Sequence, residues 1–156
     1  MDFYYPNRSN DFWYMMGLIF FGDRSALLNN DSKTFNLPKI KELLIEKGIG
    51  LNDTGYKIRR LKGNASDKFL EIIEPVPLQK LLTTYPRCRS LCTTGEKAAS
   101  VIASLTSTIA PRMGEMIESS DGLQIWRMPS TSRAFPMRIE EKARYYSIMF
   151  RHLGMI

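Results

Sequence analysis

Apolar residues recur at helical spacing in several stretches of the chain. From Asn10 onward they fall on one face of a predicted helix, which Ser9 or Asn10 would cap. Pro38 begins a second predicted helix that runs to Lys47, with Gly48 as its stop signal. Further helices are predicted over residues 77–85, from residue 94 onward, and over residues 137–152.

Short apolar segments between these helices indicate strands. The predicted strands are Gly48–Asp53, Arg87–Thr93 and Leu123–Met128, while Asp67–Ile73 fits either a strand or a short helix. The polar residues 23–36 and the basic residues 57–62 are predicted as loops. Because strands alternate with helices, we expect an α/β fold, a three-layer αβα arrangement with a mostly parallel central sheet.

The chain of 156 residues has no internal repeat and no long linker, so we expect one domain over residues 1–156. In parallel sheets, ligands bind beyond the carboxyl ends of the strands. The segments that follow predicted strands are Asn52-Asp53, Thr93-Thr94-Gly95 and Pro129–Phe135. These are the places where the sequence predicts a binding site.

The composition is that of a globular protein, with 44% hydrophobic and 24% charged residues. The longest apolar run, residues 13–21, is about half of the roughly 20 residues that a membrane span needs. It also lacks the flanking features of a signal peptide, so we expect a cytoplasmic protein with no membrane partner. Cys88 and Cys92 are expected to be buried, reduced thiols, and with one distant histidine they make a poor metal site.

The chain carries 22 Lys and Arg against 16 Asp and Glu, a formal net charge of +6. A basic balance favours a polyanionic partner. The sequence lacks GxGxxG, GxxxxGK[ST], GxSxG and paired CxxC motifs. It therefore gives no support to a dinucleotide-binding, P-loop or serine-hydrolase function, and we expect no cofactor and no metal.

What remains is a set of polar and aromatic residues near predicted helix starts and strand ends. In YYPNRSNDFW, residues 4–13, a tyrosine can stack on a nucleobase and an asparagine can orient water or bind an amide edge. Ordinary core packing and helix capping account for the same residues. Asn52 fits either contact with a pyrimidine edge or an Asx-turn. The loop PSTSRAFP, residues 129–136, fits either contact with phosphates or the approach to a helix.

Taken in order, these segments resemble the uracil-DNA glycosylase superfamily, and most closely its mismatch-specific uracil and hypoxanthine glycosylases. The family pattern YYAHPRNxFW aligns without a gap to YYPNRSNDFW at residues 4–13. The family strand of the type GIALWD or LLLN is matched by GIGLND at residues 48–53. The FxG-containing strand and helix of the family are matched by LCTTGEKA at residues 91–98. The final family loop, LPSxSxAN, is matched by MPSTSRAF at residues 128–135. The resemblance covers nearly the whole chain.

The resemblance implies a monofunctional enzyme that flips a deaminated base, uracil or hypoxanthine, out of DNA and hydrolyses its N-glycosidic bond. It implies a catalytic role for Asn10 and base contacts from Tyr5, Phe12 and Asn52. The DNA backbone would be contacted by the residues at and near the two outer motifs: Arg8, Ser130, Thr131, Ser132 and Arg133.

The sequence departs from the family pattern at three places. The family begins with a strand and a glycine- and proline-containing loop, which we expect just before residue 1. Asn7 replaces a family histidine, and Ala134-Phe135 replaces a small residue followed by asparagine. Two other functions therefore stay open: nucleic-acid binding without catalysis on the same fold, and binding of free bases or nucleosides.

Overall fold

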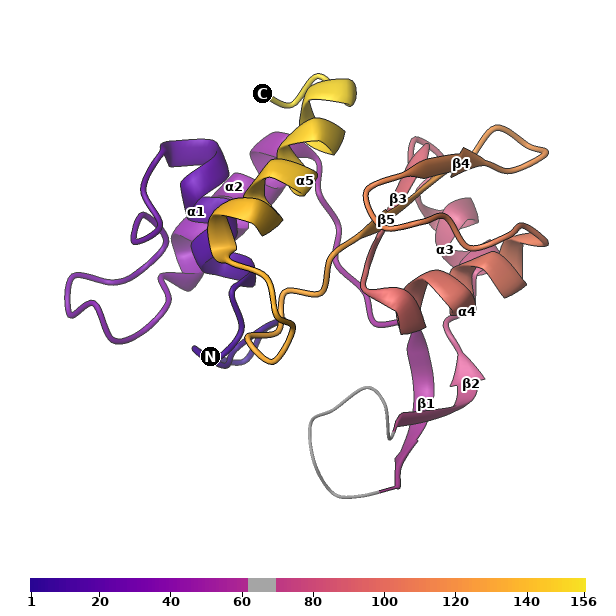
Figure 1. Cartoon of the computed structure of the whole chain (residues 1–156), viewed down its shortest axis with the longest axis horizontal. Coiled ribbons are helices and arrows are strands. Elements are labelled where there is room, and N and C mark those ends of the chain that lie inside the picture. The colour runs from indigo at the N-terminus through magenta and orange to yellow at the C-terminus, as the bar shows by residue number, and fades with distance from the viewer. Residues whose placement is uncertain (62–69) are drawn as a thin grey trace. The chain divides into compact units, whose positions relative to one another are not determined.

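Residues 1–61 and 70–156 are described by the computed structural model of this chain (Figure 1). Helices and strands are mixed along them, and the residues group into two units. Unit 1 comprises Met1–Leu51 and Pro129–Ile156, so it is built from both ends of the sequence. Unit 2 comprises Asn52–Met128.

Unit 1 contains the helices α1 (Phe12–Phe21), α2 (Leu37–Lys47) and α5 (Ile139–His152). Nearly every residue of α1 is apolar, and its first six residues are buried, as expected for a helix that is covered on all sides. The Phe20 and Phe150 rings, with centroids 5.0 Å apart, join α1 to α5. The ammonium group of Lys47 in α2 lies 5.6 Å from the Phe20 ring, so α1 contacts both other helices.

Gly17 allows α1 to approach the chain that follows it. A Cβ atom at this position would lie 2.7 Å from the backbone oxygen of Asp23, closer than side-chain atoms are tolerated. Gly22 ends the helix with φ of 69°, a left-handed conformation that favours glycine. The two glycines together let the chain turn back along α1.

Unit 2 begins with an antiparallel hairpin, β1 (Gly55–Arg60) and β2 (Leu70–Pro75), most of whose residues are exposed. After α3 (Leu78–Thr84) comes a three-stranded sheet in the order β3-β5-β4, with β3 (Ser90–Thr94), β4 (Met116–Glu118) and β5 (Gln124–Met128). Strand β3 is parallel to β5, and β4 is antiparallel to it. Helix α4 (Glu96–Thr106) follows β3 and packs against β3 and β5.

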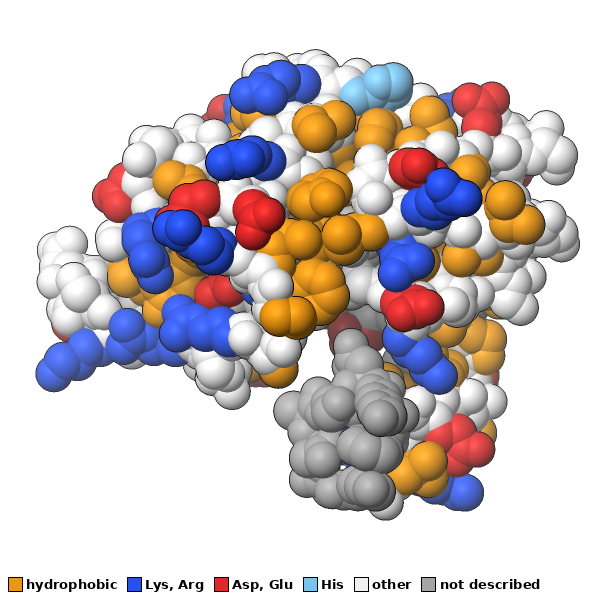
Figure 2. All heavy atoms as spheres, in the orientation of Figure 1, with side chains coloured by type: hydrophobic (Ala, Val, Ile, Leu, Met, Phe, Trp, Pro, Cys, Tyr) orange, Lys and Arg blue, Asp and Glu red, His pale blue; other side chains and the backbone are white. Residues whose placement is uncertain are grey.

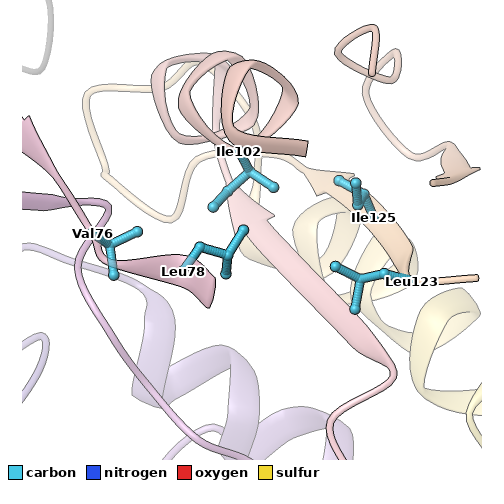
Figure 3. Close-up of a cluster of buried hydrophobic side chains, with 5 residues drawn as sticks. All are labelled: Val76, Leu78, Ile102, Leu123 and Ile125. Carbon is cyan, nitrogen blue, oxygen red and sulfur yellow. The ribbon is translucent and has the colours of Figure 1, made fainter. Parts of the chain in front are cut away.

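The core of unit 2 lies between this sheet and its helices. Figure 3 shows five buried side chains from the β2–α3 connection, α3, α4, the residue before β5 and β5 itself: Val76, Leu78, Ile102, Leu123 and Ile125. Of these, Ile125 is fully buried. Partly buried leucines of α3, α4 and β3 surround the cluster.

The predicted helices are all present, and so are the strands predicted near residues 90 and 125. The predicted strand Gly48–Asp53 is wrong. Gly48 ends α2 in a left-handed conformation, and the N–H of Ile49 bonds back to the oxygen of Leu44 at 2.9 Å, so this apolar residue closes a helix.

The predicted basic loop at 57–62 is wrong as far as Arg60, because these residues belong to β1; Lys62 lies outside the described residues. Residues 70–73 of the Asp67–Ile73 segment are strand, and Asp67 itself lies outside the described residues. Cys88 is half-buried and Cys92 is exposed, so the expectation of two buried thiols is wrong for Cys92.

A mixed helix-and-strand fold is thus confirmed, but a mostly parallel central sheet is not. The described residues form one antiparallel hairpin and one small mixed sheet. A single domain over residues 1–156 stays a prediction. In the part of the chain that the structure describes, each helix is too short or too polar to cross a membrane.

Candidate nucleic-acid-binding site

The segment before α1 and the loop before α5 lie against each other in unit 1. Asn10 and Ser132 form an isolated antiparallel bridge, and the N–H of Asp11 donates to the oxygen of Thr131 at 2.8 Å. The N–H of Arg133 donates to the oxygen of Ser9 at 3.4 Å. Two segments about 120 positions apart in the sequence are therefore held together by backbone hydrogen bonds.

Asp11 adds a charged network to this contact. Its carboxylate lies 2.8 Å from Nε of Arg133 and 2.9 Å from Nζ of Lys142, on α5. The Lys142 ammonium also donates to the oxygen of Ser132 at 2.8 Å, and the Lys142 side chain is 0% exposed. A buried charge needs such partners, so this network fixes the loop before α5 relative to the start of α1.

The other end of the loop is fixed by Tyr146, whose hydroxyl donates to the oxygen of Pro129 at 3.0 Å. Within the loop, the N–H groups of Ser132 and Ala134 donate to the hydroxyls of Ser130 and Ser132, at 3.3 and 3.2 Å. Of the loop residues predicted to contact DNA, Thr131 is buried, Ser130 and Ser132 are half-buried and Arg133 is exposed.

Tyr5 is held by an aromatic cluster. Its ring stacks on that of Phe12, with centroids 4.2 Å apart and planes 20° apart, and Phe12 meets the edge of Trp13 at 4.8 Å. The indole N–H of Trp13 donates to the oxygen of Tyr4 at 2.9 Å. Tyr5 has φ of 51°, a strained conformation for a tyrosine. Phe12 is buried, so its ring supports Tyr5 from behind.

Asn10 performs a capping role at the start of α1. Its Oδ1 accepts the backbone N–H of Phe12 at 2.9 Å, which satisfies one of the helix's unpaired donors. The N-cap of α1 is Asp11, not Ser9 or Asn10 as predicted, and Asn10 acts on the helix start from one residue before it. This hydrogen bond does not involve the amide nitrogen of Asn10, which can donate to another group.

A groove of about 560 Å³ runs beside this contact, and we call it the arginine groove. It is lined by three arginines, three serines, a tyrosine and a leucine: Arg8, Arg24, Arg133, Ser9, Ser25, Ser32, Tyr14 and Leu28. None of these lining residues is acidic. In Figure 2, Lys and Arg side chains gather at the lower left, over the N-terminal segment and the connection between α1 and α2.

Tyr14 brings the three arginines together. The guanidinium carbons of Arg24 and Arg133 lie 5.8 and 5.3 Å from the centre of its ring, within the range of cation–π attraction. Nε of Arg8 donates to its hydroxyl at 3.0 Å. The groove therefore concentrates positive charge on a buried aromatic ring.

Asp31 is an acidic residue whose pKa is affected by the charge of Arg8. The backbone N–H groups of Lys33 and Thr34 donate to its carboxylate at 2.8 and 3.2 Å, and they hold the pKa of Asp31 below its usual range. The positive charge of Arg8 lowers this pKa further, by a smaller amount. The carboxylate of Asp31 thus accepts hydrogen bonds from the turn that follows it.

Most of the predicted site residues belong to the same unit. Tyr5, Arg8, Asn10, Phe12 and the loop 130–133 all belong to unit 1. Asn52 belongs to unit 2, where it is exposed and lies between the end of α2 and β1. Its predicted contact with a base stays a prediction.

Sequence reasoning missed Asp11, Tyr14, Arg24 and Lys142. Lys142 left a signal, because it lies on the apolar face of α5, four residues before buried Tyr146 and next to buried Ala143. A lysine at such a position implies a buried partner of opposite charge. Arg24 left none, since the sequence does not show that it lies beside Tyr14.

Within residues 1–61 and 70–156, no three His, Cys, Asp or Glu side chains lie close enough to hold a metal ion. Comparison of the chain with models of protein families, with curated proteins and with solved structures finds no match.

Proposed function

We propose that this chain is a DNA glycosylase of the uracil-DNA glycosylase type, which releases uracil or hypoxanthine from DNA in base-excision repair. The observation that carries the proposal is the contact between the first and last motifs of the resemblance. YYPNRSNDFW and MPSTSRAF are joined by the Asn10–Ser132 bridge and the Asp11–Arg133 ion pair. Base and backbone contacts must meet in such an enzyme, and this contact supports their meeting in unit 1.

The reaction breaks the bond between C1′ of the deoxyribose and the base nitrogen, whose electron pair leaves with the base. A water oxygen bonds to C1′, and the water's proton is finally taken up by the departing base. Positive charge on the sugar is favoured by nearby DNA phosphates, and negative charge on the base by N–H donors. In this proposal Tyr5 stacks on the flipped base, and the Asn10 amide nitrogen supplies a donor. A contact of Asn52 with the base edge is implied by the resemblance alone, because Asn52 belongs to unit 2.

The last loop and Arg8 hold the DNA in this proposal. Hydroxyl and backbone N–H groups of Ser130–Ser132 and the guanidinium groups of Arg8 and Arg133 contact phosphates. A fixed loop loses little conformational entropy on binding, and the Asp11–Lys142 network supplies that rigidity. The finer fold, a three-layer αβα arrangement with a mostly parallel sheet and a single domain, is part of the same proposal.

The direct test uses end-labelled oligonucleotides that carry one uracil or one hypoxanthine, as single strands and as duplexes. Each is incubated with the protein, treated with hot alkali and separated on a denaturing gel. We expect cleavage at the modified position and an intact strand when thymine or adenine stands there. If a large molar excess of protein cleaves none of the modified strands, the glycosylase proposal is wrong for this chain.

A second candidate function is nucleic-acid binding without catalysis, and Asn10 favours it. Its Oδ1 accepts the N–H of Phe12, so the helix start engages one of the two lone pairs of this oxygen and sets its direction. DNA affinity that falls steeply with salt, together with no base release, would select this second function. If DNA does not bind at low salt, both functions fail. The function that then remains is binding of free bases or nucleosides, and a thermal-shift screen of these compounds tests it.

A further inference from the structure

We infer that the arginine groove binds the phosphodiester backbone of DNA, and that Arg24 is one of its phosphate contacts. The inference deepens the proposed function and rests on it only for the choice of DNA as the polyanion. Arg24 belongs to the connection between α1 and α2, outside the four motifs on which the resemblance depends. It therefore extends the DNA contact to a part of the chain that the resemblance does not assign.

The first argument is the charge of the groove. In residues 1–61 and 70–156, Arg8 and Arg24 form no ion pair within 4.0 Å; among the groove's arginines, Arg133 pairs with Asp11. Asp11 in turn shares its charge with Lys142. Like charges held close together are unfavourable in the free protein, and an anion bound between them relieves that repulsion.

The second argument is the geometry of the cations. Two guanidinium groups lie over the Tyr14 ring, and the third is bound to its hydroxyl, so all three are anchored on one buried side chain. Arg24 is exposed, and its planar fork matches two phosphate oxygens. Because the cluster is preorganised, little side-chain entropy remains to be lost when a phosphate binds.

The third argument is the rest of the lining. Three exposed serines, Ser9, Ser25 and Ser32, add neutral hydroxyl donors of the kind that commonly contact DNA phosphates. The groove is open to solvent, and a small-molecule site would normally enclose most of its ligand. An open, cationic, hydroxyl-lined groove suits a polymer backbone that passes through it.

The test measures binding to an oligonucleotide duplex of ordinary bases, so it does not depend on base release. Fluorescence anisotropy gives the affinity of the unchanged protein, Arg24→Gln and the control Arg144→Gln over a series of salt concentrations. Arg144 is an exposed arginine of α5 in the same unit, outside the groove. Each phosphate contact contributes about 0.9 to the slope of log affinity against log salt.

We expect Arg24→Gln to make the salt dependence shallower, with the magnitude of the slope smaller by about one, and to weaken the low-salt affinity roughly tenfold. Arg144→Gln should change neither quantity. The double variant Arg8→Gln, Arg24→Gln should lower the slope by about two. Circular dichroism melting curves of each variant check that the fold is retained. An Arg24→Gln protein that is folded and keeps the original slope overturns the inference, as does an equal loss in Arg144→Gln.

Two further outcomes separate the alternatives. If uridine 5′-monophosphate or inorganic phosphate competes with the duplex as well as an unlabelled duplex does, the groove binds a free phosphate ligand and the assignment to DNA is overturned. If base release is absent but binding still depends on Arg24, the glycosylase proposal fails and the groove assignment stands. If the protein releases the base but Arg24→Gln keeps the original salt slope, the glycosylase proposal stands and the groove assignment is overturned.

Discussion

Lys142 places an ammonium group where solvent does not reach it, so its charge is balanced by the groups that it contacts. Those groups are the Asp11 carboxylate and the oxygen of Ser132. Breaking a buried ion pair by removing one partner usually costs several kcal/mol, because the other charge stays buried. At this residue, stability and the position of the last loop are therefore coupled.

We predict that Lys142→Met lowers the free energy of unfolding by about 3 kcal/mol. Urea unfolding followed by circular dichroism measures it, and Lys33→Met, at an exposed lysine of the same unit, serves as the control with no comparable loss. Adding Asp11→Asn to Lys142→Met should cost less than the sum of the two single changes, since the pair acts together. Equal unfolding midpoints for Lys142→Met and Lys33→Met would refute the prediction.

Asn10 combines a capping oxygen with an amide nitrogen, and a serine can replace only the first. We predict that Asn10→Ser stays within about 0.5 kcal/mol of the original stability, because a serine hydroxyl can accept the N–H two residues on, as the asparagine oxygen does, though more weakly. Base release should fall roughly 100-fold or more, as expected when one charge-stabilising donor is lost. Single-turnover rates on the uracil or hypoxanthine strand, beside urea midpoints, separate the two effects. Unchanged base release in a stable variant would remove Asn10 from the proposed mechanism.

At the scale of elements, the close turn after α1 positions Arg24 beside Tyr14. We predict that Gly17→Ala lowers the free energy of unfolding by about 1–3 kcal/mol, because its Cβ would meet backbone that cannot move away cheaply. Gly50→Ala is the matched control, since a Cβ there meets nothing within 4 Å. A Gly17→Ala protein as stable as Gly50→Ala would show that the turn adapts without cost.

The helices could be predicted from the sequence because each has a regular apolar face and a local stop signal. Gly48 illustrates the limit of this reasoning: it ends α2, yet the apolar residues after it suggested a strand. Strand β1 was missed although Tyr56 and Ile58 alternate with Lys57 and Arg59, since its cations favoured an exposed loop. An exposed hairpin buries little, so hydrophobic patterning indicates it poorly.

The site was predictable only where its residues lie in one motif. Tyr5, Arg8 and Asn10 come from one short segment, and the structure keeps them near the predicted loop 130–133. The contact of Arg24 with Tyr14 and that of Lys142 with Asp11 depend on how helices pack. The position of Lys142 on the apolar face of α5 indicates that it has a buried partner, but the sequence does not show that this partner is Asp11.

At the scale of the whole molecule, each of the two units contains buried apolar side chains and one of the two tryptophans, Trp13 and Trp126. We predict that Ile125→Ala lowers the stability of unit 2 by about 2–4 kcal/mol, because a fully buried side chain leaves a cavity. Fluorine NMR of protein labelled with 5-fluorotryptophan, with the Trp126 signal assigned through Trp126→Phe, follows unfolding in urea.

The Trp126 signal should disappear at a lower urea concentration in Ile125→Ala than in the original protein. Ile109→Ala is the control, since Ile109 is 78% exposed in the same unit. An unchanged Trp126 transition in Ile125→Ala would mean that this cluster does not stabilise unit 2.

The Asp11–Lys142 ion pair also affects the order in which the parts of the protein fold during synthesis. Its two residues are 131 positions apart, and all of unit 2 lies between them in the chain. On the ribosome, the Asp11 carboxylate therefore has no buried cationic partner on α5 until residue 142 has left the exit tunnel, whereas the residues of unit 2 emerge earlier. Closing so long a loop is slow and entropically costly, so unit 1 should be the last part of the chain to become native. The newly made protein is thus expected to acquire its arginine groove only at the end of folding.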